Sequence, residues 1–116
     1  MTRLGQTGES AAARYLQLHG YKILEKNFRS RFGEIDIVAQ KNETVVFVEV
    51  KTRGRGALDT PGASVDVFKQ RKLIKTAHFY IINKQLADID MRFDVIEIEL
   101  HGMRCKINHI ENAFEA

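Results

Sequence analysis

A predicted β-hairpin constrains the fold of this chain more than any other feature of its sequence. Its first arm covers residues 33–40, its turn covers 41–44 and its second arm covers 45–52. In both arms, residues of the two faces alternate, and β-branched residues are frequent. Asn42 suits the positive φ that a tight hairpin turn requires. The pattern therefore predicts two antiparallel strands joined by a short connection.

The register of this hairpin brings like charges together. Symmetric closure places Asp36 opposite Glu49, and Glu34 opposite Lys51, all on one face. Opposed residues have Cβ atoms roughly 5 Å apart, and like charges at that separation are destabilising. The pattern favours a cation held between Asp36 and Glu49, and a solvated face with ordinary cross-strand charge pairs is the alternative. The other face is apolar and predicts a core that contains Ile35, Ile37, Val46, Val48 and Val50.

Length and composition narrow the class of protein. A chain of 116 residues predicts one domain over 1–116, and its contents of 44% hydrophobic and 28% charged residues are typical of soluble globular proteins. No apolar run has transmembrane length, and the N-terminal residues lack the hydrophobic stretch of a signal peptide. The single Cys105 excludes an intramolecular disulfide and suits a reducing compartment. We expect a cytoplasmic protein with no membrane partner.

Basic residues are unevenly distributed, although the net charge is only +3. One group precedes the hairpin and another follows it, on either side of the carboxylates. This arrangement suits a polyanionic partner, and the charge count alone is equally compatible with a plain solvated surface. The candidate contacts to nucleic acid are Arg29, Arg31, Arg53, Arg55, Lys69, Arg71, Lys72 and Lys75.

The rest of the pattern predicts the element order α-β-β-β-α-β-β. The expected helices cover 4–19, ended by Gly20, and 65–84, and the further strands cover 21–28, 92–100 and 104–109. These elements predict an α/β fold with a mixed sheet. Two arrangements are open: one helix on each side of the sheet, or both helices near one site.

Each predicted helix has one polar residue in or beside the row of apolar residues that is expected to face the sheet. Glu9 is at the edge of a stripe that contains Gly8 and Ala12, and it either reaches the sheet or remains an exposed glutamate favoured by the helix dipole. Gln70 interrupts the stripe formed by Val67, Ile74, Ala77 and Ile81. Its amide either bonds to backbone groups in the core or lies at the edge of a polar site. The four histidines have no metal-ligand spacing and are expected to be structural or surface residues.

The order of helix glutamate, Gly-Glu-Ile-Asp and Val-Glu-Val-Lys closely resembles the PD-(D/E)XK nuclease superfamily. Within it, the chain is most similar to the YraN-like family of bacterial proteins, and archaeal Holliday-junction resolvases have a similar order of acidic residues. Gly62, Ala63 and Ser64 stand where relatives commonly carry acidic residues. The resemblance covers nearly the whole chain and is carried by Gly5, Gly8, Glu9, 27–29, 33–36, 47–53, 61–65, 69–70 and 109–114.

The resemblance implies a restriction-endonuclease-like mixed β-sheet flanked by helices, and a metal-dependent endonuclease that hydrolyses phosphodiester bonds. The implied substrate is structured or branched nucleic acid, with DNA expected before RNA, and cutting two strands would require a homodimer. A non-catalytic nucleic-acid-binding module with the same fold is the alternative, and a scaffold protein with a vestigial acidic cluster is a third possibility. The expected catalytic residues are Asp36, Glu49, Lys51 and Gln70, and the expected ligands of Mg²⁺ or Mn²⁺ are Glu9, Asp36, Glu49 and the Val50 carbonyl.

Overall fold

The computed structural model describes residues 3–53 and 65–116 and confirms the predicted element order. The last strand is longer than expected, since it continues to Phe114 and does not end at His109. None of the described helices is long and apolar enough to cross a membrane. The elements are α1 (Arg3–Leu18), β1 (Lys22–Ser30), β2 (Gly33–Lys41), β3 (Thr44–Arg53), α2 (Val67–Asn83), β4 (Asp90–His101) and β5 (Arg104–Phe114).

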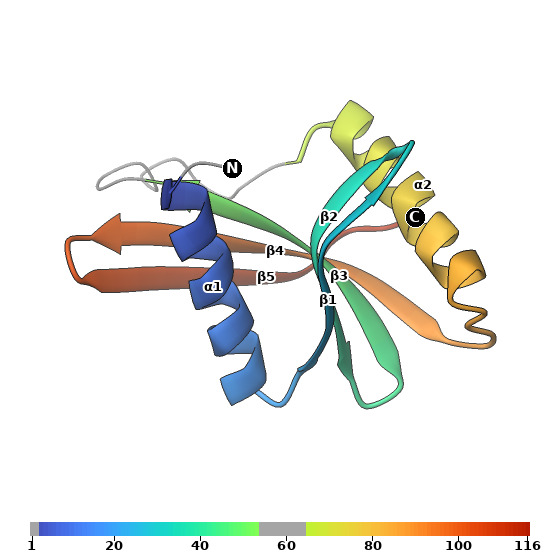
Figure 1. Cartoon of the computed structure of the whole chain (residues 1–116), viewed down its shortest axis with the longest axis horizontal. Coiled ribbons are helices and arrows are strands. Elements are labelled where there is room, and N and C mark those ends of the chain that lie inside the picture. The colour runs from blue at the N-terminus through green and yellow to red at the C-terminus, as the bar shows by residue number, and fades with distance from the viewer. Residues whose placement is uncertain (1–2, 54–64) are drawn as a thin grey trace.

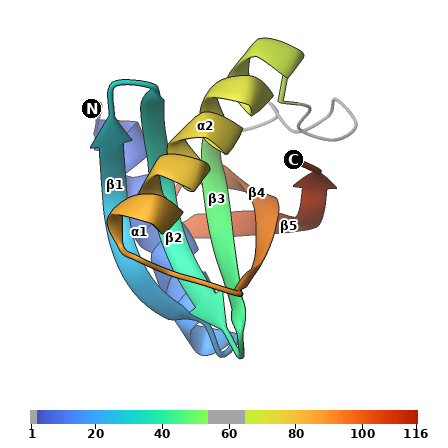
Figure 2. The same cartoon turned by 90° about the vertical axis from the view of Figure 1, so that its right-hand side faces the viewer.

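The five strands form one mixed sheet in the order β1-β2-β3-β4-β5. Strands β3 and β4 are parallel and the other neighbours are antiparallel, because α2 carries the chain back between β3 and β4. Helix α1 contacts chiefly β3, and α2 contacts chiefly β2. The helices lie on opposite faces of the twisted sheet (Figures 1 and 2). Of the two arrangements left open by the sequence, the structure has one helix on each side.

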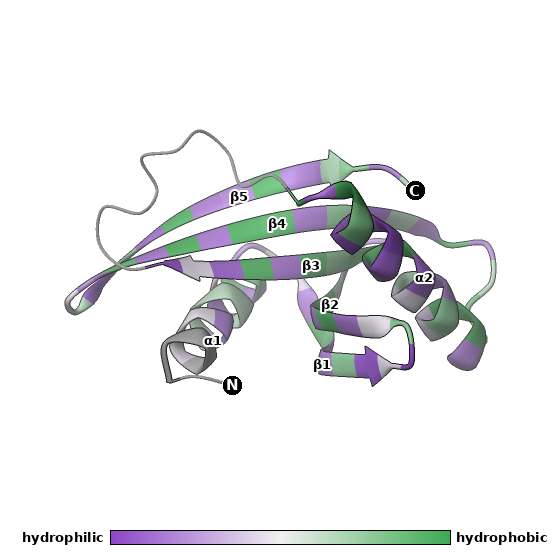
Figure 3. Cartoon of the chain, turned by 90° about the horizontal axis from the view of Figure 1, so that it is seen from above, coloured by the Kyte–Doolittle hydropathy of each residue, from purple (hydrophilic) through white to green (hydrophobic). Residues whose placement is uncertain are grey.

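Each face of the sheet has its own apolar core. On the α1 side, Ala12 and Leu16 pack with Ile37 and Val48, and on the α2 side Leu73 packs with strand residues such as Phe47. This double burial explains the continuous apolar run Val45–Val48 of β3, whose four residues are all buried. Along β4, hydrophilic and hydrophobic residues alternate (Figure 3). Among the residues that the structure describes, six polar or charged ones are also buried, and two of them are Asp36 and Glu49.

The α2 face that meets the sheet differs from the predicted stripe. Helix α2 buries Leu73, Thr76, Ala77 and Tyr80, whereas Val67 is 57% exposed. The helix begins only at Val67, after an N-terminal cap in which Asp66 accepts a hydrogen bond from the Lys69 N–H. The other members of the predicted stripe, Ile74 and Ile81, lie at the margin of the core.

A buried polar network joins α1 to the far strands of the sheet. Asp94 is 1% exposed and accepts both hydrogen bonds of a bidentate pair from Arg92, at 2.8 Å each. It also lies 2.7 Å from His109 Nε2 and accepts from the Asn112 N–H, and His109 Nδ1 lies 3.2 Å from the Tyr15 hydroxyl on α1. The expectation of a structural histidine is therefore confirmed for His109.

Candidate functional site

The candidate site lies where β2 and β3 separate. The β2–β3 ladder extends from Lys41 and Thr44 to Ile37 and Val48, in the predicted register. Asp36 is the first residue beyond the last pair, and β3 continues beside β4 as far as Arg53. The Asp36 carboxylate accepts a hydrogen bond from the Val50 N–H at 2.8 Å. The side chain thus satisfies a backbone donor that the departing strand no longer reaches.

An irregularity in β1 shapes the same point of the sheet. Asn27 has φ 53° and lies between the pairs Lys26–Ile37 and Phe28–Ile35, so it faces Asp36 outside the regular ladder. Ile35 consequently packs on the α2 side while Ile37 packs on the α1 side. The prediction that Ile35 shares a core face with Ile37 was wrong, because strict alternation does not continue through this break.

The break also changes the partner of Glu34. The sequence predicts Lys51 opposite Glu34, but the ladder ends before that pair. Glu34 instead pairs with Arg29 on β1, with 3.0 Å between Glu34 Oε2 and Arg29 Nε. Lys51 lies beside Glu97 of β4 in the parallel ladder, two residues after Glu49 and on the same side of β3.

Glu9 reaches the sheet, as one of the two sequence interpretations proposed. Gly8 is buried against Thr52 of β3 so closely that a Cβ at this position would overlap the Thr52 side chain. This contact brings the next residue, Glu9, to hydrogen-bonding range of Asn27 and Asp36. Burial raises the pKa of Glu9, the Asn27 hydrogen bond opposes that shift, and the charge of Glu34 adds to it.

Asp36 is the most perturbed group in the cluster. It is 9% exposed, and burial followed by the charge of Glu49 raises its pKa from 3.8 to about 7, against the opposing Val50 hydrogen bond. Burial raises the pKa of both Asp36 and Glu9, so the folded protein disfavours the charged form of each carboxyl group.

Glu49 is held from the other side of the sheet. It is 8% exposed, and its Oε1 accepts a hydrogen bond from Lys69 Nζ of α2 at 2.9 Å. Burial disfavours the charged ammonium, but the hydrogen bond and the charge of Glu49 outweigh burial and raise the pKa of Lys69. Two helices and two strands therefore contribute to the cluster: Glu9 comes from α1, Asp36 from β2, Glu49 from β3 and Lys69 from α2.

The amide nitrogen of Gln70 bonds to the backbone and not to a carboxylate of the site. Its Nε2 donates to the Val65 carbonyl at 2.7 Å, which fixes the chain just before α2. This is the backbone-bonded arrangement that the sequence left open as an alternative. A role for Gln70 toward a substrate stays a prediction.

The predicted basic residues are divided among several surroundings. Arg31 lies over the Phe32 ring, with 4.9 Å from its guanidinium carbon to the ring centroid, and Arg53 ends β3. The β1–β2 turn contacts α2, because a Cβ at Gly33 would lie 3.6 Å from Lys72 Cβ. The four exposed basic residues of α2 are Lys69, Arg71, Lys72 and Lys75, and Arg55 lies outside the described residues.

Asn27 belongs to a segment that carries the family resemblance, but no role at the site was predicted for it from the sequence. Among the described residues, its Oδ1 is the buried side-chain atom with no hydrogen-bond partner. An asparagine inside a predicted strand was the available signal, since asparagine is depleted in strands and tolerates positive φ. Within 3–53 and 65–116, no three His, Cys, Asp or Glu side chains are arranged as they stand to hold a metal ion.

Comparison with known proteins shows the family of this chain. A family model described as "Uncharacterised protein family UPF0102" matches residues 8–98. A UPF0102 protein of Geobacter metallireducens is 52% identical over 112 residues, which cover 97% of this chain and 92% of the relative. A UPF0102 protein of Alkaliphilus oremlandii is 46% identical over 114 residues and 97% of each chain. The chain belongs to the UPF0102 family, and this confirms the predicted YraN-like assignment.

Proposed function

We propose that this member of the UPF0102 family is a divalent-metal-dependent nuclease that hydrolyses phosphodiester bonds in structured or branched nucleic acid, with DNA as the first candidate. The observation that carries the proposal is the meeting of Glu9, Asp36 and Glu49, from three separate elements, at the fork between β2 and β3. Such a gathering of like charges opposes folding unless a cation or a proton compensates it. Retaining it in a stable fold favours a function that uses a cation.

The donor atoms at the fork suit Mg²⁺ or Mn²⁺. Carboxylate oxygens of Glu9, Asp36 and Glu49, together with the Val50 carbonyl, are the hard ligands that these ions prefer. The unpartnered buried Oδ1 of Asn27 adds a further electron-rich oxygen at the same break in the sheet. Because Glu49 is bonded to Lys69, metal binding requires Glu49 to exchange that ammonium for the metal.

The chemistry proposed for the site is the attack of water on phosphorus, with cleavage of the bond to the leaving oxygen. A bound divalent ion would polarise a phosphate oxygen and lower the pKa of the attacking water. Lys51, on the same side of β3 as Glu49, would stabilise the negative charge that grows on the phosphate oxygens. The carboxylates would orient the water, whose proton passes to a base while the leaving oxygen takes one from solvent.

A cleavage screen with matched variants tests this function. Branched, flapped, duplex and single-stranded substrates are offered with Mn²⁺ to the parent, Lys51→Ala, Glu49→Ala and the control Glu43→Ala, which removes an exposed glutamate from the β2–β3 turn. Lys51→Ala should cut about 100-fold more slowly and still bind Mn²⁺, since one preorganised stabiliser is lost. Glu49→Ala should lose both cleavage and Mn²⁺ binding, and Glu43→Ala should match the parent in both. A Lys51→Ala protein that cuts as fast as the parent contradicts the mechanism.

A nucleic-acid-binding module without catalysis is the second candidate. It is favoured by the Lys69–Glu49 ion pair, which already supplies a positive charge to the cluster. This candidate predicts that neither Mg²⁺ nor Mn²⁺ raises the melting temperature, whereas a metal at ~100 times its Kd should stabilise a nuclease by roughly 2.7 kcal/mol. A parent that binds nucleic acid, ignores both metals and cuts no substrate would establish the binding module.

A further inference from the structure

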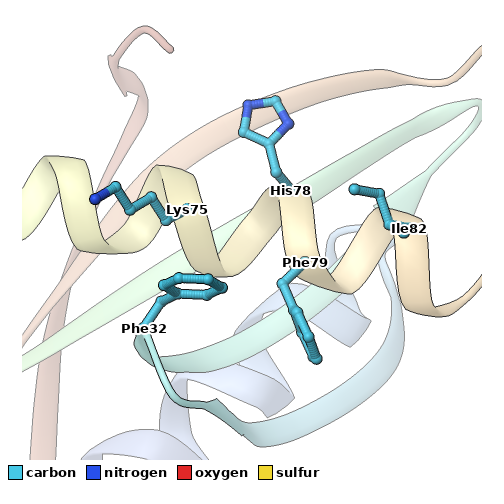
Figure 4. Close-up of a pocket in the computed structure, with 5 residues that line it drawn as sticks. All are labelled: Phe32, Lys75, His78, Phe79 and Ile82. Carbon is cyan, nitrogen blue, oxygen red and sulfur yellow. The ribbon is translucent and has the colours of Figure 1, made fainter.

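An apolar pocket opens on the outer face of α2, away from the carboxylates. Phe32, from the β1–β2 turn, lines it together with Lys75, His78, Phe79 and Ile82 of α2, and its volume is about 360 Å³. Figure 4 shows Phe32 and Phe79 on neighbouring elements, with Lys75 along the helix from them. This volume is within the range of small-molecule sites. We call this cavity the Phe32 pocket.

The walls of the Phe32 pocket are apolar where solvent reaches them. Ile82 is 76% exposed and Phe79 is 38% exposed, which is unusual for two adjacent large side chains on one helix. The Phe79 ring is supported from below, because its centroid lies 6.2 Å from those of both Phe28 and Phe32. The pocket therefore presents aromatic surface that is held in place by the core.

The surroundings of the pocket are positively charged. Helix α2 carries Lys69, Arg71, Lys72 and Lys75 and has no acidic residue between Val67 and Asn83. Arg31, beside Phe32 in the turn, adds a further cation at the rim. An occupant that complements this face combines a flat apolar surface with negative charge, and unpaired nucleotides have both properties.

We infer that the Phe32 pocket stacks an unpaired base of single-stranded nucleic acid, while Lys72 and Lys75 contact the phosphates beside it. The inference rests on the proposed function and specifies its substrate class: a nucleic acid with an unpaired strand next to the cleavage point. Lys69 and Phe79 are ten residues apart on α2, which is about 15 Å along the helix axis. A strand that follows α2 thus passes from the pocket to the carboxylate cluster, where Lys69 bonds Glu49.

The charge on α2 argues against two other occupants. A second copy of the chain docked across a two-fold axis would set the lysines of one α2 against those of the other, which is unfavourable. An anionic membrane would suit the charge, but it offers no reason for aromatic rings braced on the core and half-covered by a turn. Both occupants remain outcomes of the test below.

The experiment measures binding without metal, so that no cleavage occurs. Fluorescence anisotropy in EDTA compares a labelled single strand of about 16 nucleotides, the same strand with abasic sites, and the matching duplex. The parent should bind the intact strand about tenfold more tightly than the abasic strand, because stacking of each base is lost. This comparison needs no variant and therefore does not depend on the folding of any substitution.

Matched variants then locate the effect. Phe32→Leu keeps apolar bulk but removes the ring, and it should abolish most of the preference for the intact strand. Its control is Phe68→Leu, an equally conservative change at an α2 ring that is 76% exposed and does not line the pocket. Lys75→Ala should reduce the slope of log affinity against log salt by about one unit, and Lys106→Ala, on β5, should leave it unchanged.

The outcomes separate this inference from the proposed function. If the parent binds intact and abasic strands equally, or if Phe32→Leu binds as the parent does, the pocket assignment is overturned even when the cleavage screen succeeds. If Phe32→Leu binds strands as the parent does but no longer binds anionic vesicles, the pocket is assigned to a membrane. If it binds strands as the parent does but no longer sediments as a dimer, the pocket is assigned to a second copy of the chain. A parent that binds strands with the expected base dependence but cuts nothing supports the pocket and refutes only the nuclease.

Discussion

Replacing Asp36 with asparagine should stabilise the metal-free protein at neutral and alkaline pH. Asparagine has nearly the same shape, and its side-chain oxygen can still accept the hydrogen bond from the Val50 N–H. The substitution removes the charge that burial and Glu49 make unfavourable. In a protein without a charge cluster, removing a hydrogen-bonded carboxylate would instead destabilise the fold.

The magnitude follows from the pKa of Asp36, which is raised from 3.8 to about 7. The folded state binds the proton more tightly than the unfolded state, so stability due to this group is present below pH ~4 and is lost as pH rises toward 7. A shift of about three units at 1.36 kcal/mol each gives roughly 4 kcal/mol between the two limits. The advantage of the asparagine variant should be near zero at pH 3 and should reach its full value above pH ~7.

Urea unfolding of the parent and Asp36→Asn in EDTA, at several pH values, measures this difference. The matched control is Glu34→Gln on the same strand, where the carboxylate is exposed and pairs with Arg29, and its effect should stay below about 1 kcal/mol. Mn²⁺ at ~100 times its Kd should reduce the advantage of Asp36→Asn by up to roughly 2.7 kcal/mol, because only the parent gains the full metal-binding free energy. An advantage of Asp36→Asn that is absent at pH 8, or that does not grow between pH 4 and 7, would refute the like-charge cluster.

Three further substitutions test the supports of the site. Gly8→Ala should destabilise the fold by about 1–3 kcal/mol in thermal unfolding, because the new methyl overlaps Thr52, and Thr52→Ala should restore part of the loss. Asp94→Ala should lower the free energy of unfolding by about 3–5 kcal/mol, because it leaves buried partners such as His109 unpaired. Since the pKa of Asp94 is lowered in the fold, its stabilising contribution is lost in acid. The difference in stability between the variant and the parent should therefore shrink as pH falls below ~4. Lys69→Ala should lower metal-free stability and tighten Mn²⁺ binding by titration calorimetry, since the metal no longer competes with the ammonium.

The hairpin and its register were predictable because local rules determine them. Asn42 has φ 55°, as the turn chemistry requires, and the first pairs beyond it follow the predicted register. The element order followed from hydrophobic periodicity, which the cores on both faces explain. These features depend on neighbours within one or two elements, and the sequence displays such neighbours directly.

The geometry of the carboxylates was predictable only in part. That Asp36 and Glu49 are neighbours follows from the register, but the fork that makes Asp36 bond to Val50 depends on where β2 leaves β3. The left-handed Asn27 and the Lys69 ammonium come from other elements, so no periodicity within the hairpin could place them. Long-range packing decides these contacts.

The same argument applies to the aromatic residues. The basic residues suited a polyanionic partner, but no aromatic residue was predicted beside them. The contact between the β1–β2 turn and α2 brings Phe32 beside Phe79 and Lys75, although the two rings are far apart in the sequence. Tertiary structure, and not composition, therefore creates this cavity, which is lined by both aromatic rings and a lysine.

Lys69 connects the stability of the metal-free fold to the proposed chemistry. Its ammonium bonds Glu49, and the raised pKa of Asp36 favours a proton on that carboxyl group, so both offset the like charges of the cluster without metal. Binding of a divalent ion must release that proton and break that ion pair, and its measured affinity includes both costs. Metal affinity should therefore rise with pH up to about 7, through ionisation of Asp36, and the rise should persist in Lys69→Ala. An affinity that is independent of pH from 5 to 8 would mean that Asp36 is not a ligand, whatever the effect of Lys69.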